Sequence, residues 1–401
     1  MRWRWFIVLL ATGACQRSPA ISTPTAARTD PSAGLDACRL ESPGADALQT
    51  PLQVCRGDPL NPLVAAREFY DDGLYAEALA CAARASALSP TDPQAHSERG
   101  AALAALGQMQ DAQLAYSRAL ALNPDHLDAL LGAAHLYAVR LPSSRDRDEL
   151  AAAYSERGLA LAKLQHEEKM ATAFALLSAM AFNDLGDSQR GFERAEQALQ
   201  GDPSNGDARY ERAMALFELC RFSEARRAFN ALLNDPDHQA HANHQLGLLL
   251  EREGKFRQAE KHFAVARQLA PEDFPEVALP SPEAFRSELS KAVSELPADM
   301  RRDLAGIPVT AEDIPADTDL LSTEPPLSPT ILGLFRGPPL GEACTVNPDE
   351  PCRSVALYRR NLARTVRNKD ELFRQIKLTL LHEIGHLRGE DDLELAARGL
   401  E

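Results

Sequence analysis

A proline that recurs about every 34 residues, with one longer gap, is the feature that most restricts the fold of this chain. The prolines are Pro90, Pro124, Pro203, Pro236 and Pro271, and the successive spacings are 34, 79, 33 and 35 residues. The segments between them have the composition of helices. Since proline cannot continue a helix, each of these residues ends a helical unit. A period near 34 residues therefore predicts a stack of helical hairpins.

The residues inside these units match one repeat family. In the second unit, small, apolar and aromatic residues stand at consensus positions 8, 11, 20, 24, 27 and 32: Gly100, Leu103, Ala112, Tyr116, Ala119 and Pro124. The last unit has the same set: Gly247, Leu250, Ala259, Phe263, Ala266 and Pro271. Residues 61–271 thus resemble a tetratricopeptide array. The resemblance implies a right-handed superhelix whose concave face binds a protein or peptide, and the alternative is a spacer.

The 79-residue gap between two of the prolines hides a degenerate unit. Leu131, Gly132 and Leu136 suit its first helix, and Ala153 to Ala160 suit its second. Between them we expect a polar insertion at about Leu141 to Asp148. With this unit included, the period predicts about six hairpins.

A second motif lies at Leu381 to Asp392, which reads L-H-E-I-G-H-L-R-G-E-D-D. It holds His382, Glu383 and His386 in the spacing H-E-x-x-H. Residues four apart lie on one face of a helix, so both imidazoles can bind one Zn²⁺ ion. Glu383 stands next to the first ligand and suits a general base. The motif predicts zinc-dependent hydrolysis.

The third zinc ligand must come from nearby. Nine residues follow Asp392, and no methionine follows the second histidine to form a Met-turn. Gly389 can end the helix in a left-handed conformation, and Asp392 comes three residues later. We therefore expect Asp392 as the third ligand. The alternatives are Asp391, Glu390 and, as a fallback, Glu394. Asp391 is also a candidate to orient the imidazole of a zinc-binding histidine from outside the ligand set.

Residues 281–401 predict a small α+β domain, separated from the repeats by a proline-rich linker at 272–280. Ser281 and Pro282 begin a helix by an N-cap followed by proline. The remaining expected elements are strands near Ile307–Glu312, Ile331–Gly337 and Ser354–Tyr358 and a helix at Asp370–Leu387.

Four blocks of this domain match a known family. They are A-V-S-E-L-P (292–297), L-G-L-F-R-G-P-P-L (332–340), V-A-L-Y-R-R-N-L (355–362) and T-L-L-H-E-I-G-H-x-x-G-x-D-D (379–392). The domain resembles the bacterial zincin-like metallopeptidases, or minimal zincins. The resemblance implies a short mixed sheet packed on a metal-bearing helix, His382, His386 and Asp392 as ligands, and Glu383 as base. The implied fold class is an α-helical tetratricopeptide superhelix followed by a small α+β zincin-like domain.

Hydrolysis also needs a hydrogen-bond donor for the oxyanion. Tyr358, near the end of a predicted strand, is a candidate. We favour the simpler interpretation, in which Tyr358 is a sheet aromatic with its hydroxyl in solvent.

Residues 1–15 have the pattern of a secretory signal peptide. Arg2 and Arg4 precede an apolar core at Phe6 to Ala11, and small residues lead to Cys15. This pattern predicts a bacterial lipoprotein in which Cys15 is lipidated, although Thr12 replaces the usual leucine. An ordinary secretory signal or a short membrane anchor is the alternative. We expect a cell-envelope location, in the outer membrane or periplasm, with residues 16–60 as a flexible linker.

The remaining six cysteines can form disulfides if the chain is exported. Cys344 and Cys352 bracket a short loop, and Cys38 with Cys55 is a second candidate pair. Cys81 and Cys220 stand at apolar helical positions, where we expect free core thiols.

The net charge of −15 argues against a nucleic-acid partner, which would require a basic face. We expect an exported, lipid-anchored zinc metallopeptidase whose repeats bind protein substrates or partners. The alternative is an adaptor lipoprotein with a catalytically idle metal-binding domain. The complete H-E-x-x-H counts against the adaptor, because a structural zinc site has no use for the glutamate. Hydrolysis of an amide in a non-peptide substrate stays open.

Overall fold

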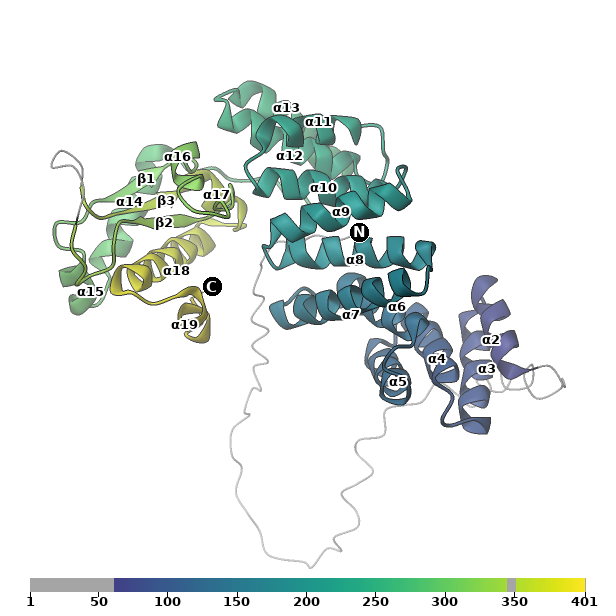
Figure 1. Ribbon diagram of the computed structural model, residues 1–401. Helices are drawn as coiled ribbons and strands as arrows, with labels where there is room; N and C mark the ends of the chain where they lie inside the picture. Colours follow the sequence, from purple (N-terminus) through teal and green to yellow (C-terminus); the bar gives the residue numbers. More distant parts are fainter. Residues whose placement is uncertain (1–60, 345–350, 401) are drawn as a thin grey trace, which may run out of the picture. The chain divides into compact units, whose positions relative to one another are not determined.

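The computed structural model describes residues 61–344 and 351–400 (Figure 1). Two compact units divide the chain between Met170 and Ala171. The predicted signal peptide, its lipidation site at Cys15 and the linker at 16–60 lie outside the described residues. Among the residues that are described, no helix is long and apolar enough to cross a bilayer.

Consecutive helices pair along the repeat region. The first unit contains α2 (Pro62–Asp71), α3 (Tyr75–Leu88), α4 (Pro93–Ala105), α5 (Met109–Leu122), α6 (Leu127–His135) and α7 (Arg145–Leu164). Then come α8 (Glu168–Asp184), α9 (Ser188–Gly201), α10 (Gly206–Glu218), α11 (Phe222–Ala231), α12 (Gln239–Arg252) and α13 (Phe256–Leu269). These are the six pairs that the proline period predicts, and the tetratricopeptide fold class is confirmed.

The last pair shows why the consensus residues produce this fold. Gly247 on α12 faces the ring of Phe263 on α13, and a methyl group at position 247 would overlap that ring. The glycine therefore lets the two helices approach closely, while the aromatic ring fills the space between them. Leu246 and Leu249 are buried in the same cluster. Burial of each such leucine contributes about 1.5–3 kcal/mol.

The degenerate hairpin differs from its prediction. Helix α6 continues as a π-helical turn at Leu136–Arg140, and α7 begins at Arg145. The expected polar insertion up to Asp148 is therefore wrong in its second half. The Ser144 hydroxyl accepts a hydrogen bond from the Arg147 amide at 3.3 Å and caps the helix. Acidic residues in the first turn also favour a helix start, so these polar residues extend α7.

The C-terminal domain is built on a three-stranded mixed sheet, so the predicted α+β class is also confirmed. The strands are β1 (Val309–Glu312), β2 (Gly333–Arg336) and β3 (Ser354–Tyr358), in the order β1-β3-β2. Strand β3 runs parallel to β1 and antiparallel to β2. The helices are α14 (Pro282–Ser294), α15 (Ala298–Asp303), α16 (Asp317–Leu320), α17 (Arg359–Arg364), α18 (Lys369–Arg388) and α19 (Asp392–Ala397).

Helices α14 and α18 cover one face of this sheet (Figure 1). Val355 and Leu357 on β3 are buried against both helices, in one cluster with Phe285, Ile376 and Leu380. Since side chains alternate along a strand, Ala356 and Tyr358 point to the opposite face. The metal-motif helix α18 is thus held against the sheet by an apolar core.

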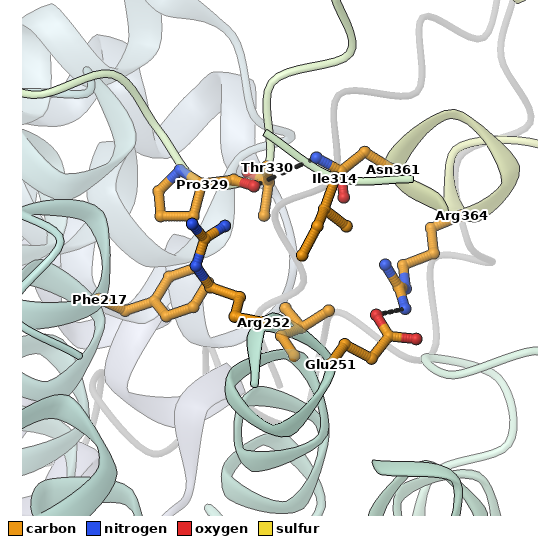
Figure 2. A pocket seen from close by; sticks show the side chains of 9 residues that line it. Phe217, Glu251, Arg252, Ile314, Pro329, Thr330, Asn361 and Arg364 are labelled. Atoms are coloured by element: carbon orange, nitrogen blue, oxygen red, sulfur yellow. Dashed lines mark hydrogen bonds and ion pairs between the residues drawn. The ribbon is translucent and has the colours of Figure 1, made fainter. Parts of the chain in front are cut away.

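Within the second unit, α17 contacts the last repeat hairpin through a buried ionic cluster. Glu251 on α12 is only 6% exposed. One of its oxygens accepts from Arg360 at 2.8 Å and the other accepts from Arg364. Figure 2 shows Glu251 and Arg364 beside a cavity of about 10 Å³, which Phe217 and Asn361 also line. We call Glu251, Arg360 and Arg364 the junction cluster.

The cysteines are only partly as predicted. Cys344 and Cys352 form a disulfide with their Cα atoms 5.8 Å apart, and Cys220 is a free thiol. Cys81 is disulfide-bonded, so the prediction of a free thiol there is wrong. The error has a simple cause: an apolar helical position indicates burial, and burial suits a thiol and a disulfide equally. The candidate pair Cys38–Cys55 lies outside the described residues.

Candidate metal centre

Helix α18 presents the two motif histidines on one face. The Asn368 side chain caps its start by accepting from the Glu371 amide at 2.9 Å, and Gly389 ends it with φ = 91°. The Nε2 atoms of His382 and His386 lie 2.9 Å apart. The observed helix, Lys369–Arg388, extends one residue beyond the predicted range at each end.

The Asp392 carboxylate converges on the same point. Its Oδ1 lies 3.3 Å from His386 Nε2 and 3.6 Å from His382 Nε2. The histidine side chains are 25% and 28% exposed and that of Asp392 is 85% exposed, so the site opens to solvent. His382, His386 and Asp392 form the one group among the described residues whose ligand atoms could hold a metal ion.

The alternative carboxylates are engaged elsewhere. Asp391 and Glu394 form a capping box at the start of α19: the Asp391 side chain accepts from the Glu394 amide at 2.9 Å, and the Glu394 side chain accepts from the Asp391 amide at 3.1 Å. Glu390 pairs with Arg398 through its side chain. Asp391 therefore caps a helix in this structure, whereas the sequence suggested that it orients an imidazole.

The three ligand atoms have the spacing and chemistry that zinc requires. A tetrahedral Zn²⁺ site with bonds of 2.0–2.1 Å separates its ligand atoms by about 3.3 Å. The observed separations of 2.9, 3.3 and 3.6 Å lie around that value. The Nδ1 atoms of His382 and His386 face the carbonyl oxygens of Leu400 and Glu390, at 2.5 and 3.0 Å. A carbonyl can only accept, so Nδ1 carries the proton and Nε2 offers its lone pair to a metal.

Glu383 is buried beside this group and bound to the sheet. Its Oε2 accepts a hydrogen bond from the backbone amide of Phe335 on β2 at 2.7 Å, and the residue is 5% exposed. Burial raises the pKa of the Glu383 carboxyl to about 8; the Phe335 amide opposes this rise and the Asp392 carboxylate adds to it. A bound cation would act in the opposite direction and favour the carboxylate form.

Several groups that shape the site escaped the sequence reasoning. A methyl group on Gly385 would overlap Leu395, so this glycine allows α19 to pack on α18. The sequence did contain a sign of the Gly385 contact, because an isolated glycine inside a helix commonly marks close packing. The contacts of the Phe335 amide and of the Glu390 and Leu400 carbonyls left no signal, because every residue carries these backbone groups.

The loop after β2 reaches the end of the metal-motif helix. The Leu340 amide donates to the Leu387 carbonyl at 2.7 Å. The Arg353 guanidinium donates to the carbonyls of Pro338 and Pro339, at 2.7 and 2.9 Å, and so fixes the shape of the loop. The segment that leads into the Cys344–Cys352 loop therefore contacts the C-terminal end of α18.

Tyr358 is not part of the group His382, His386 and Asp392 whose ligand atoms converge. In the sheet register it is flanked by Glu312 and Leu332, and its side chain points to the face opposite α18. Its hydroxyl is 3.5 Å from Arg336 Nη2, and burial raises the pKa of the phenol. The residue is fully buried, so the expectation of a hydroxyl in solvent is wrong; Arg336 and its acidic partners cover that face.

Comparisons with known proteins agree with this architecture. Residues 304–400 match the family model described as zincin-like metallopeptidase, and residues 93–126 and 183–243 match tetratricopeptide repeat models. No curated protein matches the chain. Similar solved structures include YrrB, a repeat protein "with an unusual peptide-binding site" (16% identity, TM-score 0.38, 47% of this chain and 92% of that one). They also include PilF of Pseudomonas aeruginosa (14% identity, TM-score 0.42, 56% of this chain and 93% of that one).

Proposed function

We propose that this chain, which carries a zincin-like metallopeptidase domain behind tetratricopeptide repeats, is a zinc-dependent peptidase whose repeats bind protein substrates or partners. The observation that carries the proposal is the convergence of His382, His386 and Asp392 within 3.6 Å, with Glu383 buried beside them. Two imidazoles, one carboxylate and an adjacent glutamate form the residue set of a catalytic zinc site.

Different residues have different roles in the proposed hydrolysis. When bound, Zn²⁺ supplies a Lewis acid that acidifies water and polarises a carbonyl. His382, His386 and Asp392 would hold it and leave a position open toward solvent. Glu383 takes the proton from the attacking water and delivers it to the leaving amine. The Phe335 amide holds Oε2 and so fixes the orientation of the Glu383 carboxyl.

The test combines metal content with peptide cleavage in the purified full chain. We expect Glu383→Gln to keep its zinc and to lose at least about 100-fold in kcat, the usual range for loss of a general base. Asp370→Asn, the same chemical change at an exposed position of the same helix, should alter neither. A Glu383→Gln variant with full activity would exclude the proposed role of Glu383.

The adaptor alternative makes a different prediction in the same assay. An adaptor with an idle metal domain would bind one zinc per chain and cleave nothing across a broad peptide library. A chelator that removes the zinc would then lower the stability of the folded domain. It would change no catalytic rate, because an adaptor has no catalytic activity. Chelator-sensitive cleavage supports the peptidase.

We also propose that the chain is exported and anchored to the envelope by a lipid on Cys15. The signal pattern at residues 1–15 supports this location, and so does the Cys344–Cys352 disulfide, because disulfides persist in oxidising compartments. Incorporation of labelled palmitate into the wild type and not into Cys15→Ser would test it. An unlabelled wild type would contradict it.

A further inference from the structure

One short segment, Glu390–Leu400, contacts both motif histidines. The Leu400 carbonyl accepts from His382 Nδ1 at 2.5 Å, and the Glu390 carbonyl accepts from His386 Nδ1 at 3.0 Å. The same segment carries Asp392. It therefore supplies both the third ligand atom and the outer hydrogen-bond partners of the other two ligands.

The segment is held on α18 by a specific set of contacts. Leu395 is fully buried and packs directly over Gly385. The Leu400 amide donates to the Leu395 carbonyl at 3.1 Å, after Gly399 turns the chain with φ = 71°. The Leu400 side chain is also buried. The Leu400 carbonyl is thus aimed at His382 by the packing of α19.

We propose that the Leu400 carbonyl is the positioning group for His382 and that residues 390–400 close the metal site as one unit. This inference rests on the proposed zinc binding. The Leu400 carbonyl fixes the protonated nitrogen and the ring orientation of His382, so that Nε2 faces Asp392 and His386. Removal of such outer partners typically weakens metal binding 10–100-fold.

The direct test compares two truncations of the full chain. Deletion of residues 400 and 401 removes the Leu400 carbonyl, whereas deletion of Glu401 alone leaves Leu400 with a terminal carboxylate that still offers an acceptor oxygen to His382 Nδ1. We expect the first deletion to weaken the zinc Kd about 10–100-fold, measured by competition with a chelator, and the second to change it less than about threefold. The absorption spectrum of the Co²⁺-loaded chain should change only in the first. Equal zinc Kd values in the two truncations would overturn the inference.

A second pair of variants tests the segment without shortening the chain. Gly385→Ala pushes against Leu395 and should weaken the zinc Kd, although every ligand is still present. The double variant Gly385→Ala/Leu395→Ala removes the overlap and should recover at least part of the loss. Zinc binding by Gly385→Ala equal to that of the wild type would contradict closure by this segment. A wild type that binds no zinc would instead overturn the proposed function itself.

Discussion

The metal centre and the junction cluster both gather charged or polar groups, but they do so in opposite ways. At the junction, the Glu251 carboxylate lies between the guanidinium groups of Arg360 and Arg364, and all three side chains are largely buried. At the metal centre, two imidazole lone pairs and a carboxylate face one another at the surface. The junction joins two cations to one anion, although Arg364 Nη1 is buried without a hydrogen-bond partner among the described residues, whereas the candidate metal centre brings together three groups that can donate electron pairs.

This difference separates structural from functional use of polar residues. A buried ion pair is kept because loss of one partner leaves an uncompensated charge. Two imidazoles and a carboxylate, supported by outer hydrogen bonds, are the kind of group that binds a cation. Arg360 also lies over the Phe256 ring at 4.3 Å, which further ties α17 to the repeats.

The largest difference between the two regions is expected when one residue of each is substituted separately. Glu251→Ala leaves the buried Arg364 without its carboxylate, whereas Arg360 keeps Asp313 at 3.2 Å, and it should lower the free energy of unfolding by about 3–5 kcal/mol. Its zinc Kd should stay within about threefold of the wild type. His386→Ala should behave in the opposite way, with zinc bound at least about 100-fold more weakly and the unfolding of the metal-free chain almost unchanged.

Chemical denaturation and chelator competition measure the two effects. Glu295→Ala is the matched control, because Glu295 forms a partly exposed pair with Lys377 at 3.4 Å. It should cost less than about 1 kcal/mol. If Glu251→Ala costs no more than Glu295→Ala, the junction cluster does not stabilise the unit.

The next effect is a pH dependence of folding stability that arises on the repeat side of the junction. Burial lowers the pKa of His244 well below its usual value, and the nearby Arg364 and His241 add to the lowering. Folded His244 stays neutral, while the unfolded chain takes up a proton near pH 6.5. Its contribution to stability is therefore complete above about pH 6.5 and falls below it, by up to about 1.4 kcal/mol per pH unit.

Urea unfolding at pH 7.5 and 5.5 would detect this loss. His244→Asn should have a smaller difference between the two pH values than the wild type, and His166→Asn, at an exposed position, should match the wild type. The same loss in His244→Asn as in the wild type would assign the acid sensitivity to another group.

The smallest effect is expected at Tyr358. Tyr358→Phe removes a hydroxyl that lies 3.5 Å from Arg336, on the sheet face opposite α18. We expect a loss of about 0.5–1.5 kcal/mol in unfolding free energy and a kcat within twofold of the wild type. A 100-fold fall in kcat would make Tyr358 a donor to the reacting carbonyl and would contradict its placement here.

The regular parts of this fold could be predicted because their sequences either repeat or contain a continuous run of apolar residues. The proline period located the hairpins, and the apolar run Ser354–Tyr358 predicted β3 with its observed bounds. The 3.6-residue period gave α18 to within one residue at each end. The same spacing placed His382 and His386 on one face, since local helical geometry alone decides that relation.

The remaining features depend on contacts between distant residues. Glu251 and Arg360 are 109 positions apart, and no local pattern connects a repeat helix with a turn of helix after a strand. The Leu400 carbonyl and the Phe335 amide are backbone groups, so only the folded chain shows that they meet His382 and Glu383. Sequence spacing predicted the candidate ligands that the structure brings together, but not the backbone groups that contact His382 and Glu383.

The segment Glu390–Leu400 also determines when, during synthesis of the chain, the candidate metal site is completed. A polypeptide is made from its N-terminus, so the repeats and the sheet are synthesised before residue 390. Until the Leu400 carbonyl and the Asp392 carboxylate arrive, His382 lacks its outer partner and the site lacks its third ligand. The group of ligand atoms is therefore complete only after residues 390–400 have been synthesised and have packed on α18.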